Sequence, residues 1–180
     1  PGLRTSAGFV SAGAPVTLFL TGPPVPGSGP PAVIRIQRRT YDASGEQWTA
    51  GEELPVRSVP GTISWVPRAA GCYVFRWLPS AGGKARPTAE AVVWVTGPGV
   101  AEGVSPDQMI AVVAERERVA VGDKARLLLV SREAELTGAL TEEVGDEVLG
   151  HRWVRLSGEL IVLDVPVTEL HRPGFALALQ

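Results

Sequence analysis

Cysteine is nearly absent from this sequence: Cys72 is the only one among 180 residues, so no internal disulfide can form. Its scarcity argues against a small extracellular scaffold stapled by disulfides, and it fits the bacterial periplasm or a cytosol equally well. The chain also lacks an apolar run of roughly 18 residues, so no membrane-spanning helix is expected. The N-terminus shows no basic region followed by an apolar one, so no signal peptide is predicted. The last alternating run stops abruptly, which suggests a fragment.

A surplus of basic residues is missing as well. The sequence holds 17 Lys and Arg against 19 Asp and Glu, a formal net charge of −2. Proteins that bind nucleic acid usually carry positive charge to neutralise phosphates, so no nucleic-acid partner is expected.

The motifs of common enzyme classes are absent: there is no G-x-S-x-G elbow, no P-loop and no G-x-G-x-x-G after a strand. The glycine-rich segment 22–29 is also rich in proline, which lacks the backbone N–H that would hold a phosphate. We therefore predict a loop there. No catalytic residue and no cofactor is predicted, and the chain is not expected to be an enzyme.

Metal sites are not expected either. His151 and His171 have no Cys or carboxylate at ligand spacing, and a site needs three or four convergent ligands. Both are predicted to be solvated residues of loops or strand ends. Asp42, Ser44 and Glu46 alternate around Gly45 but supply too few oxygens for a calcium loop. The other carboxylates are interleaved with arginines and are expected on solvated faces: residues 115–117, 133–135 and 142–147.

Cys72 lies in the aromatic run 72–77, with neither an activating partner nor the glutamine that closes a thioester ring. It is predicted to be a small buried apolar residue. Trp65, Trp77 and Trp94 lie in apolar runs and are assigned to cores. Trp48 lies in a polar segment and is the only tryptophan expected to be exposed, which is a weak basis for carbohydrate binding.

Glycine and proline, by contrast, are abundant: 21 Gly and 16 Pro cut a chain that is 44% hydrophobic into short apolar runs. Short alternating runs between turn residues are typical of a β-sandwich. Residues 42–45 are predicted to form a hairpin tip. The predicted strands are residues 15–21, 32–40, 54–59, 62–66, 71–78, 89–96, 108–115, 124–131, 138–143, 147–156, 159–166 and 174–179.

Residues 96–103 hold three Gly and one Pro between two alternating patterns, which marks a domain boundary. We predict an all-β chain of two tandem immunoglobulin-like sandwiches, residues 1–98 and 105–180, joined by a linker at 99–104. The second half has six predicted strands against the roughly seven of a complete sandwich, so its closing strand is expected to be missing.

The order of several motifs resembles the bacterial α2-macroglobulin family. Residues 94–97 read W-V-T-G, residues 122–125 read G-D-K-A before an apolar strand, and residues 165–168 read V-P-V-T. The resemblance covers residues 54–180. Three positions depart from the family: Val119 replaces an aromatic residue, residues 172–174 replace a Pro-Asn pair, and residues 79–83 replace a D-x-x-G turn. The matching segments are 70–75, 91–97, 110–115, 119–129, 153–156 and 161–168.

This resemblance implies two consecutive macroglobulin-like domains, just upstream of the bait region of a broad endopeptidase inhibitor. In that family a protease cleaves the bait, the molecule collapses around it, and a C-x-E-Q thioester elsewhere can tether it; neither bait nor thioester is identifiable here. The implied role is scaffolding, in the periplasm or outside the cell. The implied partners are neighbouring domains, with segment 22–31 as one candidate contact, and endopeptidases bound by the parent protein; any membrane anchor would lie elsewhere. The alternative is a tandem immunoglobulin-like adhesion or carbohydrate-binding module.

Overall fold

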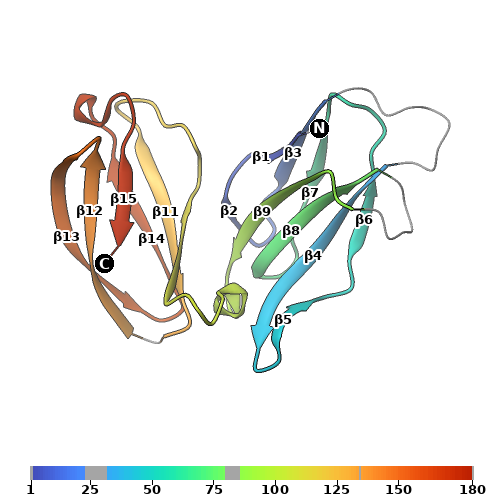
Figure 1. The fold of residues 1–180 in the computed structure, drawn as a ribbon, viewed down its shortest axis with the longest axis horizontal. Coiled ribbons are helices and arrows are strands. Elements are labelled where there is room, and N and C mark those ends of the chain that lie inside the picture. Colours follow the sequence, from blue (N-terminus) through green and yellow to red (C-terminus); the bar gives the residue numbers. More distant parts are fainter. Residues whose placement is uncertain (1, 23–31, 80–85, 134, 180) are drawn as a thin grey trace.

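A computed structural model describes residues 2–22, 32–79, 86–133 and 135–179. Within these ranges the chain is all-β, with 15 strands and two short 3-10 helices. The strands form four sheets that pack in pairs as two immunoglobulin-like β-sandwiches, with the helix η1 (Val100–Gly103) between them (Figure 1). The all-β sandwich fold predicted from the turn-punctuated runs is confirmed.

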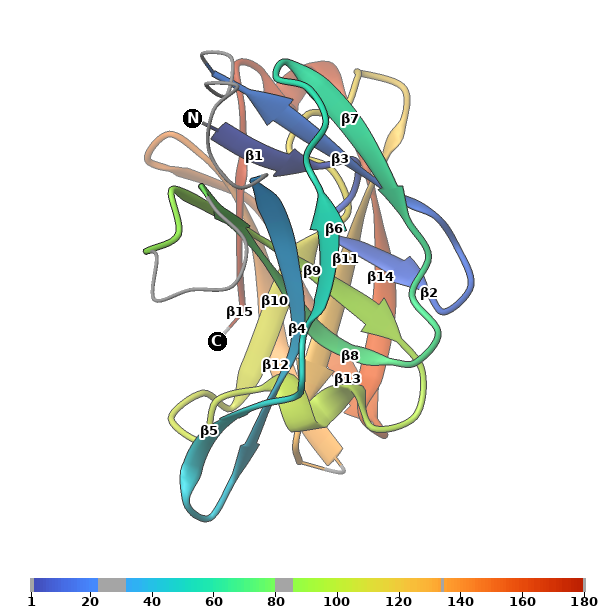
Figure 2. The same ribbon diagram turned by 90° about the vertical axis from the view of Figure 1, so that its right-hand side faces the viewer.

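The first sandwich packs a three-stranded sheet on a six-stranded one. The small sheet has the order β1-β3-β7, and the large sheet has the order β2-β9-β8-β4-β5, with β6 also paired to β4. Their bounds are β1 (Gly2–Thr5), β2 (Phe9–Ser11), β3 (Val16–Thr21), β4 (Val33–Asp42), β5 (Gly45–Trp48), β6 (Glu52–Pro55), β7 (Gly61–Trp65), β8 (Gly71–Leu78) and β9 (Ala89–Thr96). Figure 2 views the molecule with this sandwich in front.

Alternation along the strands builds the first core. Val16, Leu18 and Leu20 of β3 point inward and are at most 2% exposed, because successive side chains of a strand face opposite sides. From the large sheet, Ile34 of β4 and Phe75 of β8 pack against them, both fully buried. One hydrophobic core therefore joins the two sheets.

The second sandwich is built from two three-stranded antiparallel sheets, β10-β11-β14 and β13-β12-β15. Leu127 and Leu129 of one sheet pack against Leu156 of the other in a separate core. The bounds are β10 (Ile110–Ala114), β11 (Lys124–Ser131), β12 (Glu135–Val144), β13 (Glu147–Ser157), β14 (Leu160–Pro166) and β15 (Ala176–Leu179), with the 3-10 helix η2 (Glu169–His171) before β15.

Most of the predicted strands are present. All six of the second half occur, and Asp42 pairs with Gly45 at the predicted hairpin tip. The short strands β1, β2 and β5 were not predicted, and the strand expected at 54–59 is β6, at Glu52–Pro55. The predicted loop and contact segment at 22–31, apart from Gly22, lies outside the described residues, as does most of 79–83. The domain bounds and the missing closing strand remain predictions.

Neither 3-10 helix in the described ranges is long and apolar enough to cross a membrane.

Phe75 and Phe19 offer a matched test of the first core, because Phe75 is fully buried and Phe19 is 42% exposed. We expect Phe75→Ala to lower the free energy of unfolding by about 3–5 kcal/mol, through lost burial and the cavity left behind. Phe19→Ala should cost less than half as much. Urea unfolding followed by tryptophan fluorescence measures both; equal losses would contradict this account of the core.

Candidate functional site

The described residues hold no group of three or more His, Cys, Asp or Glu side chains placed to bind a metal ion. The structure brings none of the sequence-selected carboxylates into a convergent cluster with His151, which lies exposed on β13. Asp42, at the β4–β5 hairpin, accepts hydrogen bonds from the backbone N–H of Ser44 (2.7 Å) and from its hydroxyl (2.6 Å). These bonds lower the pKa of the Asp42 carboxyl and account for this residue as a turn element.

His171 differs from its prediction. It is 8% exposed rather than solvated, and it packs against Phe175 with ring centroids 4.6 Å apart. The backbone N–H of Thr168 donates to its Nδ1 at 2.8 Å, so His171 closes the turn of η2. The Thr-x-x-His spacing of this cap is the sequence signal that could have revealed a structural histidine.

The tryptophans also require one correction. Trp65, Trp77 and Trp94 are buried as predicted. Trp48, however, lies at the end of β5 and is half-buried, with the Arg76 guanidinium 4.0 Å from its ring centroid. The exposed ring is Trp153 on β13, at 74% exposure. Alternation could have revealed it, because in the run 153–156 Trp shares a face with Arg while Val154 and Leu156 face inward.

A third hydrophobic cluster lies between the two sandwiches. Cys72 of β8 and Trp94 of β9 face outward from the first sandwich and meet Leu128 and Val130 of β11. All four are at most 6% exposed. Burying each of the two β11 side chains contributes about 1.5–3 kcal/mol. The remaining buried members are Phe9, Val100, Ala101 and Val104.

Helix η1 fills the centre of this junction. The segment predicted as a linker is therefore a packed element, with Val100, Ala101 and Gly103 buried. A Cβ at Gly103 would lie 2.5 Å from Cβ of Cys72 and 3.2 Å from Trp94. Gly103 is thus required by close approach, and its lack of a side chain lets the helix lie directly on β8 and β9.

Cys72 is fully buried under η1, as predicted for a small apolar residue. Burial raises the pKa of its thiol, and the nearby guanidinium of Arg39 opposes the shift. Arg39 Nη2 lies 3.3 Å from Sγ. The thiol is protonated and shielded at neutral pH, which makes it unreactive for as long as the junction stays closed.

Polar groups fix both ends of η1. Arg38 of β4 donates to the Gly99 carbonyl (3.3 Å) and pairs with Glu102 (2.8 Å). On the opposite side, the Gly99 N–H donates to Glu159 Oε2 at 2.9 Å. Gly99 takes a left-handed conformation (φ +77°), which glycine adopts without strain. Groups from both sandwiches therefore bind the same short helix.

Three further contacts cross the junction directly. The Gly8 N–H donates to the Glu115 carbonyl at 2.7 Å. Arg132 donates to the carbonyl of Tyr41 at 3.2 Å, and the guanidinium carbon of Arg126 lies 5.7 Å from the ring centroid of Phe9. The junction combines an apolar centre with a polar border, which is the anatomy of a specific interface.

The segments that carry the family resemblance meet in space. Cys72 pairs with Trp94 across β8 and β9, so one residue from each of the segments 70–75 and 94–97 lies at the junction. In the second sandwich, the G-D turn before β11 binds the V-P-V-T run. The Gly122 N–H donates to the Val167 carbonyl, and the Val167 N–H donates to the Asp123 carbonyl, both at 2.9 Å. Gly122 has φ +96°, which explains the glycine.

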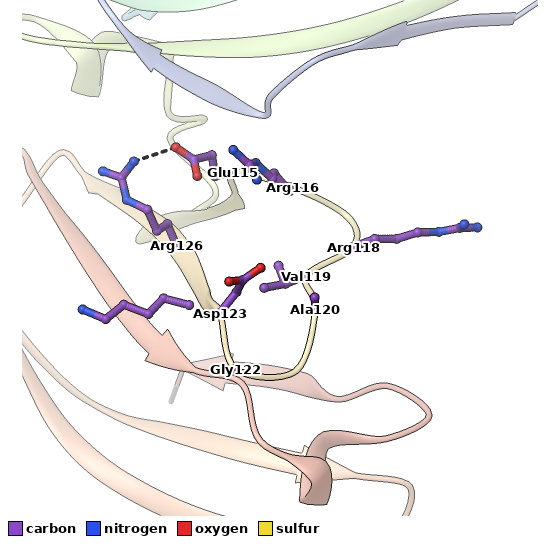
Figure 3. Close-up of a pocket in the computed structure, with 9 residues that line it drawn as sticks. Glu115, Arg116, Arg118, Val119, Ala120, Gly122, Asp123 and Arg126 are labelled. Atoms are coloured by element: carbon purple, nitrogen blue, oxygen red, sulfur yellow. Dashed lines mark hydrogen bonds and ion pairs between the residues drawn. The ribbon is translucent and has the colours of Figure 1, made fainter.

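The same turn lines a shallow pocket of about 540 Å³ with Glu115, Arg116 and Arg118 (Figure 3). Glu115 pairs with Arg126 at 2.6 Å there. Its charged groups come from the β10–β11 loop and the start of β11, and most of them are open to solvent, with no fully buried acid or base among them. We assign the candidate function to the junction.

Gly103 gives a direct test of the junction. We expect Gly103→Val to force η1 off β8 and expose Cys72, because the new side chain has no room. The measurement is the rate at which a thiol reagent such as Ellman's reagent labels Cys72 in the native protein, which should rise at least tenfold. Gly150→Val is the control, since a Cβ at Gly150 meets nothing within 4 Å. Unchanged labelling with retained stability would contradict the close packing.

No family model matches the sequence, and no curated protein matches it. Two solved structures of alpha-2-macroglobulin from Escherichia coli resemble the fold. One is the native conformation, with a TM-score of 0.34, 13% identity and coverage of 96% of this chain. The other is the trypsin-activated form, with a TM-score of 0.31, 13% identity and 95% coverage. The chain spans 13% of each of those proteins.

Proposed function

We propose that this chain is a scaffold segment of an α2-macroglobulin-like endopeptidase inhibitor. In this role the two sandwiches form part of the wall of a larger molecule that encloses a protease after its bait is cleaved. The segment contributes shape and stiffness, and no residue of it takes part in bond making or breaking. Its partners are neighbouring domains of the parent protein, and it meets endopeptidases only as part of that parent, in the periplasm or outside the cell.

The observation that carries the proposal is that β11 is buried on both faces. Leu127 and Leu129 belong to the core of the second sandwich, whereas Leu128 and Val130 belong to the junction. A flexible connection would leave the outer face of this strand polar. The continuous apolar run of β11 instead suits two domains held in one fixed orientation. A wall that encloses a protease needs such rigid pairs of domains.

The family motifs support the same assignment because of what they do in the fold. Trp94 of residues 94–97 contributes to the junction, and residues 122–125 and 165–168 supply the turn contact of the second sandwich. Motifs of an enzyme family would instead converge on a pocket with reactive groups. Here each motif builds the framework.

The test uses the full-length protein that carries these residues, incubated with a panel of endopeptidases. We expect cleavage at one exposed segment, then compaction seen by small-angle scattering, and protection of large but not small substrates. Gly103→Val in the full-length protein should leave bait cleavage intact but reduce compaction and protection, because the wall loses stiffness. Gly150→Val should behave like the full-length protein without a substitution. Cleavage with no change in shape would refute the trap.

Trp153 supports a second candidate, a carbohydrate-binding module. Its indole is 74% exposed on β13, and exposed aromatic rings stack on sugar faces. This function predicts that the chain binds members of a glycan array and that Trp153→Ala abolishes binding. Trp48→Ala should have little effect, because Arg76 already covers one face of that ring. An array without hits would eliminate this candidate.

A further inference from the structure

A groove runs along the border of the two sandwiches, on the side where β1, β3 and β9 approach the β10–β11 loop. Its volume is about 810 Å³. Part of its lining is apolar: Phe19 is 42% exposed and Val92 is 39% exposed, with Leu3 and Ala114 beside them. The exposed apolar surface therefore lies in a shallow groove, and apolar surface gathered in a groove is typical of a surface that binds a partner.

The acidic groups of this groove are largely neutralised. Glu90 is paired with Arg76 at 3.0 Å, and Glu115 is paired with Arg126 at 2.6 Å. Both carboxylates already have a guanidinium partner, so they add little net negative charge to the groove.

The basic groups are different. Arg4, Arg116 and Arg118 line the groove, are exposed, and have no ion-pair partner among the residues described. Glu117 is the one unpaired acid beside them. Figure 3 shows Arg118 pointing away from the Glu115–Arg126 pair, toward open solvent. The groove therefore carries net positive charge on a protein whose net charge is −2.

We propose that this groove binds an extended protein segment in which carboxylates alternate with apolar side chains. In an extended segment successive side chains point to opposite sides. Apolar residues can then lie on Phe19 and Val92 while carboxylates on the other side meet Arg116 and Arg118. Guanidinium groups bind carboxylates through paired hydrogen bonds, which adds direction to the charge attraction.

The apolar lining favours a protein segment over a nucleic acid. Phosphate binding needs basic groups along a backbone track and gains little from Phe19 and Val92, unless bases stack on the ring. The site also depends on the junction, because one wall belongs to each sandwich. Binding is separate from the scaffold role and needs no protease.

The experiment titrates the intact chain into a short fluorescein-labelled peptide that alternates Glu with Leu and Val, at low salt, and follows anisotropy. Arg116→Glu with Arg118→Glu should weaken binding at least about tenfold. Arg57→Glu with Arg68→Glu is the control: it makes the same change of charge at two exposed arginines outside the groove, and it should change affinity less than threefold. Phe19→Ser should weaken binding several-fold and so report the apolar contribution.

Three results would overturn the proposal. They are equal binding of a peptide with Lys in place of Glu, equal weakening by the control pair, and tighter binding of a single-stranded oligonucleotide of the same charge. Amide spectra of the labelled protein give a second readout: shifts should centre on residues 114–118 and on Phe19. The two proposals can fail separately. If the full-length protein traps proteases but this chain does not bind the peptide, the groove proposal fails and the scaffold function stands.

Discussion

The structure depends on the close approach of η1 to β8 and β9, which only a residue without a side chain at position 103 allows. Because Gly103 touches Cys72, the helix can lie flat on the large sheet, and Val100 and Val104 can enter the same cluster as Leu128. The hydrogen bonds of Gly99 with Arg38 and Glu159 then stabilise the position of η1 that this packing determines. Without that approach, the two sandwiches would keep only the direct contacts at the edge of the junction, such as Gly8 with Glu115 and Arg132 with Tyr41.

This arrangement divides the chemistry of the molecule into two zones. The buried zone is apolar and specific in shape, and its lone thiol and its histidine are both used for packing. The exposed zone holds the arginines of the groove and the ring of Trp153. Any binding partner must therefore be recognised at the surface, through groups that the folded core does not need.

Local patterns predicted the fold well, because alternation and turn residues act over a few neighbours. The strands at β3, β8 and β11 follow directly from such runs. The junction was harder to predict, since it depends on contacts between distant segments: nothing near position 103 indicates that Cys72 lies above it. The run at 127–130 did carry a signal, because a strand with one solvated face would alternate. The predictions were wrong for His171, which is buried, and for the exposed tryptophan, which is Trp153. The Thr-x-x-His cap spacing and the alternation of residues 153–156 were the signals that indicated both.

The two-sided burial of β11 has a thermodynamic meaning. A strand that belongs to one core through Leu127 and Leu129 and to the junction through Leu128 and Val130 cannot lose one environment and keep the other intact. The two sandwiches therefore share a single structural element, and their unfolding equilibria are linked. Two sandwiches linked in this way respond to substitution as one unit, because a change that loosens the first is also felt in the stability of the second.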